Sequence, residues 1–279
     1  VWLFEKGVVM RLNKFLAQAG VSSRRGGDEL IRKGRVTVNG EVVSDLGRKV
    51  EPAKDAIKVD GKRVFTESFH YYLFHKPEGM ITTLDDPEGR VSIKEVVQRM
   101  IGHVFPVGRL DYNTEGLLFL TNDGELAQKI LHPKFQVPRR YEAKVQGILE
   151  PETFDRLRRG VRLEDGWASA DVRPIRKMEK NSYLSVTVTE GRKHVVRRLM
   201  AAVGHEVIHL SRVSFGPLEL GPLSRGQWRP MESGEVRRLK EWVEANAHHV
   251  AGKAKPGVGK PGPVAGKPRF EKGPSRSAA

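Results

Sequence analysis

The sequence predicts an α+β protein: a small basic unit followed by a larger body with a mixed, largely antiparallel sheet. In residues 10–67, two helical patterns precede two short hairpins. In residues 68–247, strand patterns outnumber helices and do not alternate with them as in a parallel sheet. Residues 248–279 contain 11 glycines and prolines and only one aromatic residue, which predicts a disordered basic tail.

The N-terminal unit has clear local signals. Apolar residues recur at helical spacing from Leu12 to Ala19, and Gly20 is expected to end this first helix. Ser22 or Ser23 is expected to cap a second helix that runs through Ile31.

Two glycines and two turns complete this unit. Gly26-Gly27 lies inside the second predicted helix, where each glycine costs about 1 kcal/mol relative to alanine. Residues 35–43 and 57–64 each place β-branched residues around a turn, Asn39-Gly40 in the first and Asp60-Gly61 in the second. Both patterns predict a β-hairpin.

The alternating elements of the body are expected at defined positions. The predicted strands are 71–74, 104–107, 116–121, 141–145, 183–189 and 207–213. The predicted helices are 93–100, 125–131, 151–159, 194–202 and 234–245.

The charge distribution indicates a polyanionic partner. The formal net charge is +15. Residues 10–67 carry 13 lysines and arginines against 8 acidic residues, and residues 248–279 carry 7 against 1. Neutralising phosphates releases condensed counterions, so basic segments at both ends of a body favour nucleic acid.

Several other classes of protein are disfavoured. The chain has no cysteine, which removes disulfides and zinc–sulfur sites and agrees with a reducing cytosol. No apolar run is long enough to cross a membrane, and Val1–Met10 is too short and mixed for a secretory signal. We expect translation to begin at Met10. His132, His205 and His209 are scattered, so we expect no metal site.

Asp111 is the central candidate for chemistry. An apolar strand leads into Gly108-Arg109-Leu110-Asp111, and a polar turn then leads into the apolar segment 116–120. A carboxylate at the end of a buried strand is held rigidly, and it needs a nearby cation to stay ionised there. On this pattern alone, an ordinary turn aspartate is the commoner interpretation.

The first segment resembles an S4-type RNA-binding domain. The resemblance rests on residues 10–25, MRLNKFLAQAGVSSRR, and residues 31–40, IRKGRVTVNG. Members of that family fold as two helices with a small sheet and bind structured RNA through a basic helical face. The resemblance implies that the RNA-binding residues here are Arg11, Lys14, Arg24, Arg25, Arg32, Lys33 and Arg35.

The body resembles the RsuA/RluB family of bacterial rRNA pseudouridine synthases. The segment VGRLDYNTEGLLFLTNDGELA matches the signature of that family and is closer to the large-subunit type. The resemblance implies that Asp111 is the catalytic carboxylate. It also places Tyr141 of the strand RRYEAKV in the active site. In EGRKHVVRRLM it pairs Arg197 with the aspartate, beside the apolar Val196.

The resemblance therefore implies isomerisation of a uridine in 23S rRNA, free or in a partly assembled subunit. It implies a cytoplasmic monomer with no cofactor, metal or membrane attachment. Asp111 would attack C6 of uracil or C1′ of ribose, or act as a base on the sugar through a glycal. Tyr141 would stack on the uracil and take part in proton removal from C5. Arg109 and Arg140 would hold the RNA backbone or fill the gap left by the base.

Two other functions fit parts of the sequence. A non-catalytic RNA-binding or ribosome-assembly protein would keep the fold without the activity, and the presence of the complete residue set argues against it. A hydrolase using Asp111 and Glu115 would release uracil, but no acid partner is found in the pattern around them.

Overall fold

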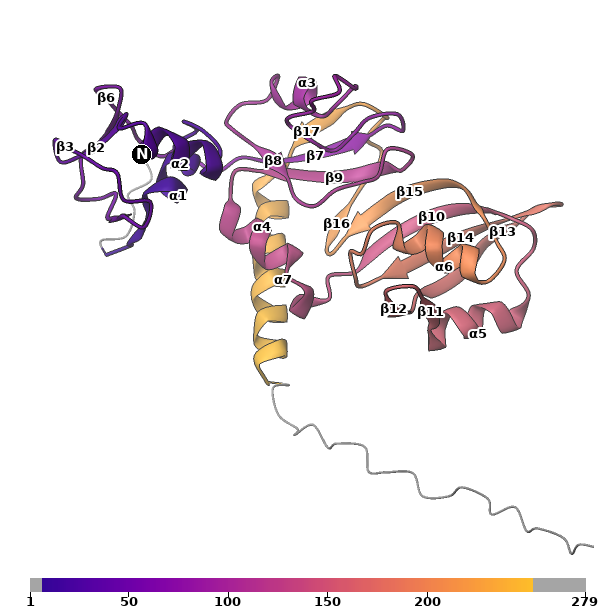
Figure 1. The fold of residues 1–279 in the computed structure, drawn as a ribbon. Coiled ribbons are helices and arrows are strands. Elements are labelled where there is room, and N and C mark those ends of the chain that lie inside the picture. The colour runs from indigo at the N-terminus through magenta and orange to yellow at the C-terminus, as the bar shows by residue number, and fades with distance from the viewer. Residues whose placement is uncertain (1–6, 253–279) are drawn as a thin grey trace, which may run out of the picture.

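The computed structural model describes residues 7–252, which form a small N-terminal unit and a larger body (Figure 1). The helices of the small unit are α1 (Leu12–Gln18) and α2 (Arg24–Arg32). Its four-stranded antiparallel sheet has the order β3 (Glu41–Val42), β2 (Val36–Val38), β5 (Ile57–Val59) and β6 (Lys62–Arg63). A separate pair joins β1 (Met10–Arg11) to β4 (Lys49–Val50).

The local signals of this unit work as expected. Asn39 and Gly40 have φ values of 54° and 93°, and Asp60 and Gly61 have 49° and 79°. Two successive left-handed residues match the twist of a two-residue hairpin turn. Ser23 supplies the helix cap, because its side chain accepts a hydrogen bond from the Gly26 amide at 3.1 Å.

The body contains one nine-stranded sheet, and the expected mixed, largely antiparallel arrangement is confirmed. The main path is β13 (Asp171–Lys177), β14 (Asn181–Val188), β10 (Arg139–Gln146), β15 (Val207–Phe215), β9 (Glu115–Thr121), β7 (Tyr71–Lys76) and β17 (Trp228–Pro230). The short strands β8 (Phe105–Pro106) and β16 (Leu218–Glu219) pair with β9 and β15. Only β9 and β15 run parallel, through two residue pairs.

The β7–β9 half of the sheet is covered on both faces. Every residue of β9 is buried, as is typical of a central strand with two packed faces. Leu117 and Phe119 pack with α4 (Gly124–Leu131) and α7 (Ser233–Gly252), whereas Leu118 and Leu120 belong to the core beside α3 (Lys94–Val97). The short helix η1 (Pro133–Phe135) connects α4 to β10.

The β10–β14 half has one covered face. Buried and half-buried residues alternate along both strands, so every second side chain points into the core. The helices α5 (Pro151–Arg159) and α6 (Val195–Ala202) supply residues such as Leu157 and Leu199 to this core. The small hairpin β11 (Val161–Leu163) and β12 (Gly166–Ala168) lies beside them (Figure 1).

The structure also differs from the sequence-based expectations. The strand β13 was not predicted, because Pro174 interrupts its pattern; proline is tolerated there because β13 is an edge strand with a register shift after Pro174. The helix α7 continues to Gly252, inside the expected tail, and residues 253–279 lie outside the described residues. No helix among residues 7–252 is both long and apolar enough to span a bilayer.

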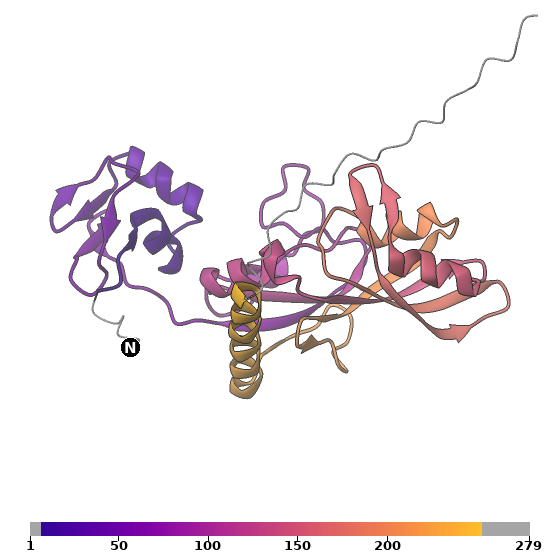
Figure 2. The ribbon, with the colours of Figure 1, turned by 90° about the horizontal axis from the view of Figure 1, so that it is seen from below.

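A single chain passage joins the small unit to the body (Figure 2). Side-chain contacts add to this link. The Lys14 ammonium lies 2.6 Å from a carboxylate oxygen of Glu125 at the start of α4. Glu67 accepts hydrogen bonds from the His103 backbone amide, at 3.0 Å, and contacts its imidazole.

Candidate active site

Asp111 lies in the loop between β8 and β9. The Leu110 amide donates to the Thr82 hydroxyl at 3.2 Å, and that hydroxyl donates to the Leu110 carbonyl at 2.7 Å. The Thr114 amide donates to the Asp111 carbonyl at 3.1 Å, which closes a turn before β9. The backbone is therefore fixed while the Asp111 side chain stays 38% exposed. The loop presents a carboxylate that a substrate can reach.

Asp111 faces a cavity of about 760 Å³ between the two halves of the sheet. This volume falls within the range of about 300–1,000 Å³ typical of small-molecule sites. The wall is formed by residues 107–111, residues 130–133 of α4 and η1, residues 189–196, and side chains from β10 and β15. The cavity brings together four of the predicted residues: Arg109, Asp111, Tyr141 and Val196.

Tyr141 forms one wall of this cavity from the centre of β10. Its side chain is buried, with 9% of the residue exposed, and it belongs to the main core. Val196, near the start of α6, is 3% exposed and lines the same cavity, as does Leu210 of β15. An aromatic face and two aliphatic side chains thus lie near one carboxylate.

His194 is the cationic partner closest to Asp111. Its Nε2 lies 3.3 Å from Asp111 Oδ1, which is an ion pair whenever the imidazole is protonated. His194 occupies the left-handed region with φ of 52°, immediately before α6 begins. Sequence reasoning missed this residue; the only available signal was a histidine inside the strand-to-helix motif.

The expected ion pair between Arg197 and Asp111 is absent from the structure. Arg197 Nη1 instead donates to the Val207 carbonyl at 2.9 Å, and Nη2 donates to the Asn113 carbonyl. The Arg197 guanidinium therefore donates to two backbone carbonyls. Because Asn113 follows Asp111 by two residues, Arg197 holds the Asp111 loop against α6 and β15.

Arg140 also lies elsewhere than expected. It is exposed and pairs with Glu219 at 2.7 Å, and it does not line the cavity. Successive side chains of a strand point to opposite faces, so Tyr141 shares its face with Arg139 and not with Arg140. Arg139 does line the cavity. Burial lowers the pKa of Arg139, and the neighbouring Arg212 lowers it further.

Lys76 is a buried cation beneath the Asp111 loop that the sequence analysis also missed. It has no exposed surface, and its Nζ donates to the carbonyls of Pro77, at 2.8 Å, and Thr114, at 2.9 Å. Burial lowers the pKa of Lys76 to about 8, although the negative charge of Asp111 opposes this shift. Its one sequence signal was a lysine at the end of an apolar strand.

Arg212 is the largest fully buried side chain of the described residues. Its Nε donates to the Leu117 carbonyl at 2.9 Å, and its guanidinium carbon lies 4.9 Å from the centre of the Phe215 ring. Opposite it, Gly116 has φ of 109°, and a Cβ there would lie 2.3 Å from the Arg212 carbonyl oxygen. Glycine is therefore required where β9 meets β15.

Comparison with known proteins identifies the family. The RNA pseudouridylate synthase family model matches residues 70–202, and the S4 domain model matches residues 10–57. The chain is 50% identical over 232 residues to an uncharacterized RNA pseudouridine synthase of Aquifex aeolicus, with 82% of this chain and 93% of that protein covered. The chain belongs to the RNA pseudouridylate synthase family.

Further relatives agree with this assignment. The synthase is 44% identical to the ribosomal large subunit pseudouridine synthase B of Bacillus subtilis, over 82% of this chain and 95% of the relative. Among solved structures, a crystal structure of a pseudouridylate synthase matches with a TM-score of 0.59 and 28% identity. That match covers 82% of this chain and 99% of the other.

The predicted RNA-binding residues of the S4 domain fall into two groups. Three of them contact other parts of the synthase: Arg11 donates to the Leu46 carbonyl, Lys14 pairs with Glu125, and Arg35 pairs with Asp60. The other four, Arg24, Arg25, Arg32 and Lys33, are exposed and have no carboxylate within 4.0 Å among residues 7–252. They lie on α2 and its C-terminal cap.

Proposed function

We propose that this synthase isomerises one uridine of 23S rRNA to pseudouridine, with Asp111 as the catalytic carboxylate. The observation that carries the proposal is the placement of Asp111 and Tyr141 in one cavity of a chain with this family's fold. The large-subunit target is supported by the relative named ribosomal large subunit pseudouridine synthase B. We expect a cytoplasmic monomer acting on free rRNA or on a partly assembled subunit.

The reaction needs no external reagent. The N1–C1′ bond breaks, the uracil turns, and C5 bonds to C1′. The proton on C5 then leaves, and N1 gains a proton, so all atoms of the nucleotide are conserved. The site must therefore supply a group that acts at the base or sugar, a surface that retains the detached uracil, and a proton acceptor near C5.

Asp111 supplies the first of these requirements. Each of the three routes, through C6, C1′ or a glycal, begins at this carboxylate. Lys76 lies beneath the loop, and His194 Nε2 lies 3.3 Å from the carboxylate, so two nitrogen-bearing side chains from different elements lie next to Asp111 or its loop. Arg197 fixes the loop through the Asn113 carbonyl and acts as a positioning residue.

Tyr141 and the aliphatic wall supply the other two requirements, which are the surface that retains the uracil and the group that takes part in proton removal from C5. The Tyr141 ring can stack on the uracil face, while Val196 and Leu210 limit how far the detached base can move. We assign to the Tyr141 hydroxyl the transfer of the C5 proton, which it accepts while passing its own proton to water. The apolar wall also keeps water away from the broken glycosidic bond.

The target uridine must leave its helix to reach this cavity. Extruding a base costs a few kcal/mol, which contacts to the RNA backbone offset. Arg109 precedes Asp111 by two residues, is exposed, and lines the cavity. Arg109 fills the gap that the extruded base leaves, and the exposed cations of α2 contact the surrounding RNA.

The test uses cells that lack this gene, complemented with the native protein or with Asp111→Asn. Carbodiimide treatment followed by primer extension maps pseudouridine along both ribosomal RNAs. We expect one stop in 23S rRNA that the native protein restores and Asp111→Asn does not. Asp155→Asn, the same chemical change at an exposed position of α5, is the matched control and should restore the stop.

The outcomes separate the parts of the proposal. A stop in 16S rRNA would keep the activity and reject the large-subunit target. Full restoration by Asp111→Asn would reject the site. If pseudouridine changed at no position under any condition while the native protein still bound rRNA, we would conclude that the protein binds rRNA without modifying it.

A further inference from the structure

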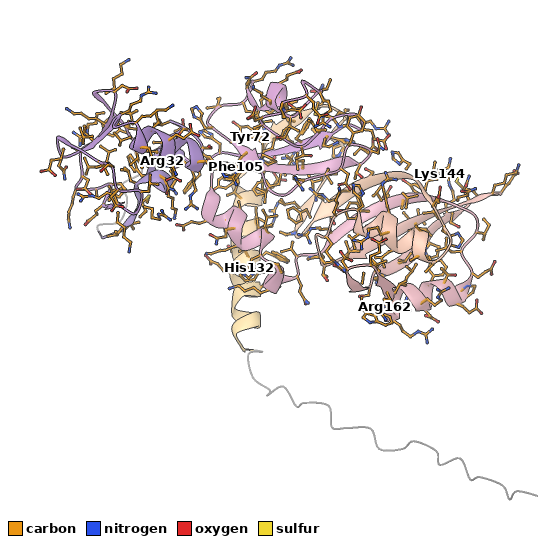
Figure 3. The ribbon with its side chains drawn as sticks, viewed as in Figure 1. Arg32, Tyr72, Phe105, His132, Lys144 and Arg162 are labelled. Atoms are coloured by element: carbon orange, nitrogen blue, oxygen red, sulfur yellow. The ribbon has the colours of Figure 1, made fainter. Side chains whose placement is uncertain are left out.

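Trp167 is an exposed aromatic residue beside the active site that the mechanism does not use. It lies on β12, with 71% of its surface exposed. Its neighbour on the paired strand is Arg162, also exposed and labelled on the hairpin side of the body in Figure 3. Tryptophan is enriched where proteins bind partners, because its ring offers a large flat apolar area with a polar edge.

The hairpin that carries Trp167 is held rigidly. Leu163 and Ala168, on its inner face, are buried in the main core. Across the turn, Arg192 donates to Asp165 Oδ1 at 2.8 Å and to the Trp167 carbonyl at 2.8 Å. Asp165 also accepts from Arg198 Nη1 at 2.9 Å. The Trp167 backbone is thus fixed, and a rigid platform loses little entropy when it binds a ligand.

The same contacts join the hairpin to the catalytic cavity. Arg192, which binds the Trp167 carbonyl, lines the cavity together with Lys193 and His194. Lys193 is exposed, and neither Lys193 nor Arg162 has a carboxylate within 4.0 Å in the part of the chain that the structure describes. The hairpin therefore presents the Trp167 ring and Arg162 on adjacent strands, and its backbone is tied to the cavity wall through Arg192, next to Lys193 in the chain.

We propose that Trp167 is a stacking platform for an unpaired nucleobase of the substrate RNA, near the uridine held at Asp111. Single-stranded RNA is recognised by bases stacked on aromatic side chains, with basic residues along the backbone. Arg162 and Lys193 contact the phosphates on either side of the stacked base. This subsite rests on the RNA substrate of the proposed function and adds a place where the synthase reads the RNA outside its cavity.

The first test measures stacking without turnover. The full chain is titrated with a 12-nucleotide oligouridylate while tryptophan fluorescence is recorded. We expect quenching in the native protein that is clearly smaller in Trp167→Phe, because Trp228 and Trp242 are half-buried and present in both proteins. Equal quenching in both proteins would overturn the proposal, whatever the outcome of the rRNA mapping.

The second test separates stacking from fold. Base stacking contributes about 1–3 kcal/mol, so Trp167→Ala should raise the Kd for the oligouridylate about 5- to 150-fold. Trp167→Phe keeps an aromatic ring and should recover most of this loss. Ile175→Ala, a change at a half-exposed residue of the edge strand β13, is the control and should bind as the native protein does.

Turnover on rRNA gives a third readout. On unmodified 23S transcript, Trp167→Ala should raise KM and leave kcat close to native, because the chemistry occurs at Asp111. A loss of kcat with unchanged KM would reject the platform. If the native protein formed no pseudouridine on the transcript, that result would count against the proposed function. The fluorescence titration would still decide whether Trp167 stacks on RNA.

Discussion

The cations around Asp111 and those of helix α2 are used in opposite ways. Around Asp111, Lys76, Arg197 and Arg212 donate to backbone carbonyls, and Lys76 and Arg212 are almost completely buried. On α2 and its cap, Arg24, Arg25, Arg32 and Lys33 are exposed, without a carboxylate within 4.0 Å among the described residues. The same residue types therefore determine geometry in one region and affinity in the other.

The two groups of cations differ because one is buried and the other is exposed to solvent. A buried cation must replace its water shell with fixed acceptors, so it stays in one place and salt screens it weakly. An exposed cation keeps its water and its mobility, and it acts on RNA by releasing counterions. We therefore expect changes in the cavity to alter kcat, and changes on α2 to alter binding and its salt dependence.

The largest expected effect is at Arg197. Arg197→Met removes both backbone contacts and frees the loop that carries Asp111. A misplacement of the reacting group by about 1 Å costs on the order of 10²-fold in rate, so kcat should fall by about that factor with little change in KM. Single-turnover kinetics on 23S transcript measure this, and Arg197→Lys should recover part of the rate through one retained contact. An equal rise in KM would show that Arg197 binds RNA.

The next effect is on binding. Replacing Arg24, Arg25, Arg32 and Lys33 by glutamine should weaken rRNA binding and leave single-turnover kcat unchanged. Each lost phosphate contact lowers the slope of log K against log salt by about 0.7–0.9, so four lost contacts should lower it by about 3.

A charge-matched control comes from the strand side of the same domain. Glutamine at the exposed residues Lys49, Lys54, Lys58 and Lys62 removes the same charge from a different face. If the control changed the slope as much as the α2 variant does, net charge and not the helical face would account for binding.

Lys76 provides a pH test of burial. The pKa of Lys76 is about 8 in the folded protein, whereas a lysine in water has a pKa of 10.5, so between these pH values the unfolded chain holds a proton that the folded chain has released. The free energy of unfolding of the native protein, relative to Lys76→Met, should therefore rise with pH across this window, by at most about 1.4 kcal/mol per pH unit. Denaturant unfolding at a series of pH values measures the difference, and a flat difference would mean that Lys76 is not desolvated.

The smallest effect is expected at Gly27. A Cβ there would lie 3.4 Å from the Asn13 Cα, which is an ordinary contact. Gly27→Ala should therefore stabilise the S4 domain by about 0.5–1 kcal/mol through helix propensity. Thermal unfolding measures it. A decrease in Tm would show that α1 and α2 need the closer approach of glycine.

Local signals predicted most of the fold. The Asn39-Gly40 and Asp60-Gly61 turns, the Ser23 cap and the helix 151–159 follow from residues a few positions apart. The strand β13 and the β11–β12 hairpin could not be predicted from local signals. Proline and charged residues weaken their strand patterns, and pairing with neighbouring strands stabilises them. Propensity describes the isolated chain, and tertiary pairing overrides it.

The site was predicted less completely for a related reason. Asp111, Tyr141, Arg109 and Val196 line one cavity, and their catalytic and binding roles stay predictions. Arg139, which strand alternation places on the same face as Tyr141, was not among the predicted residues. Lys76 and Arg212 come from distant strands, and nothing in the linear sequence shows that Thr114 and Leu117 would present carbonyls to them.

The two-residue parallel seam between β9 and β15 has a consequence for the order of folding. Strands β7 and β9 come from one stretch of chain and β10, β14 and β15 from another, so these two groups can each pair early, and β17 joins β7 from a distant segment. Joining them closes a long loop for few hydrogen bonds, which makes it a late event. The S4 domain leaves the ribosome first and its hairpins form locally. A nascent chain should therefore hold RNA before its catalytic cavity exists.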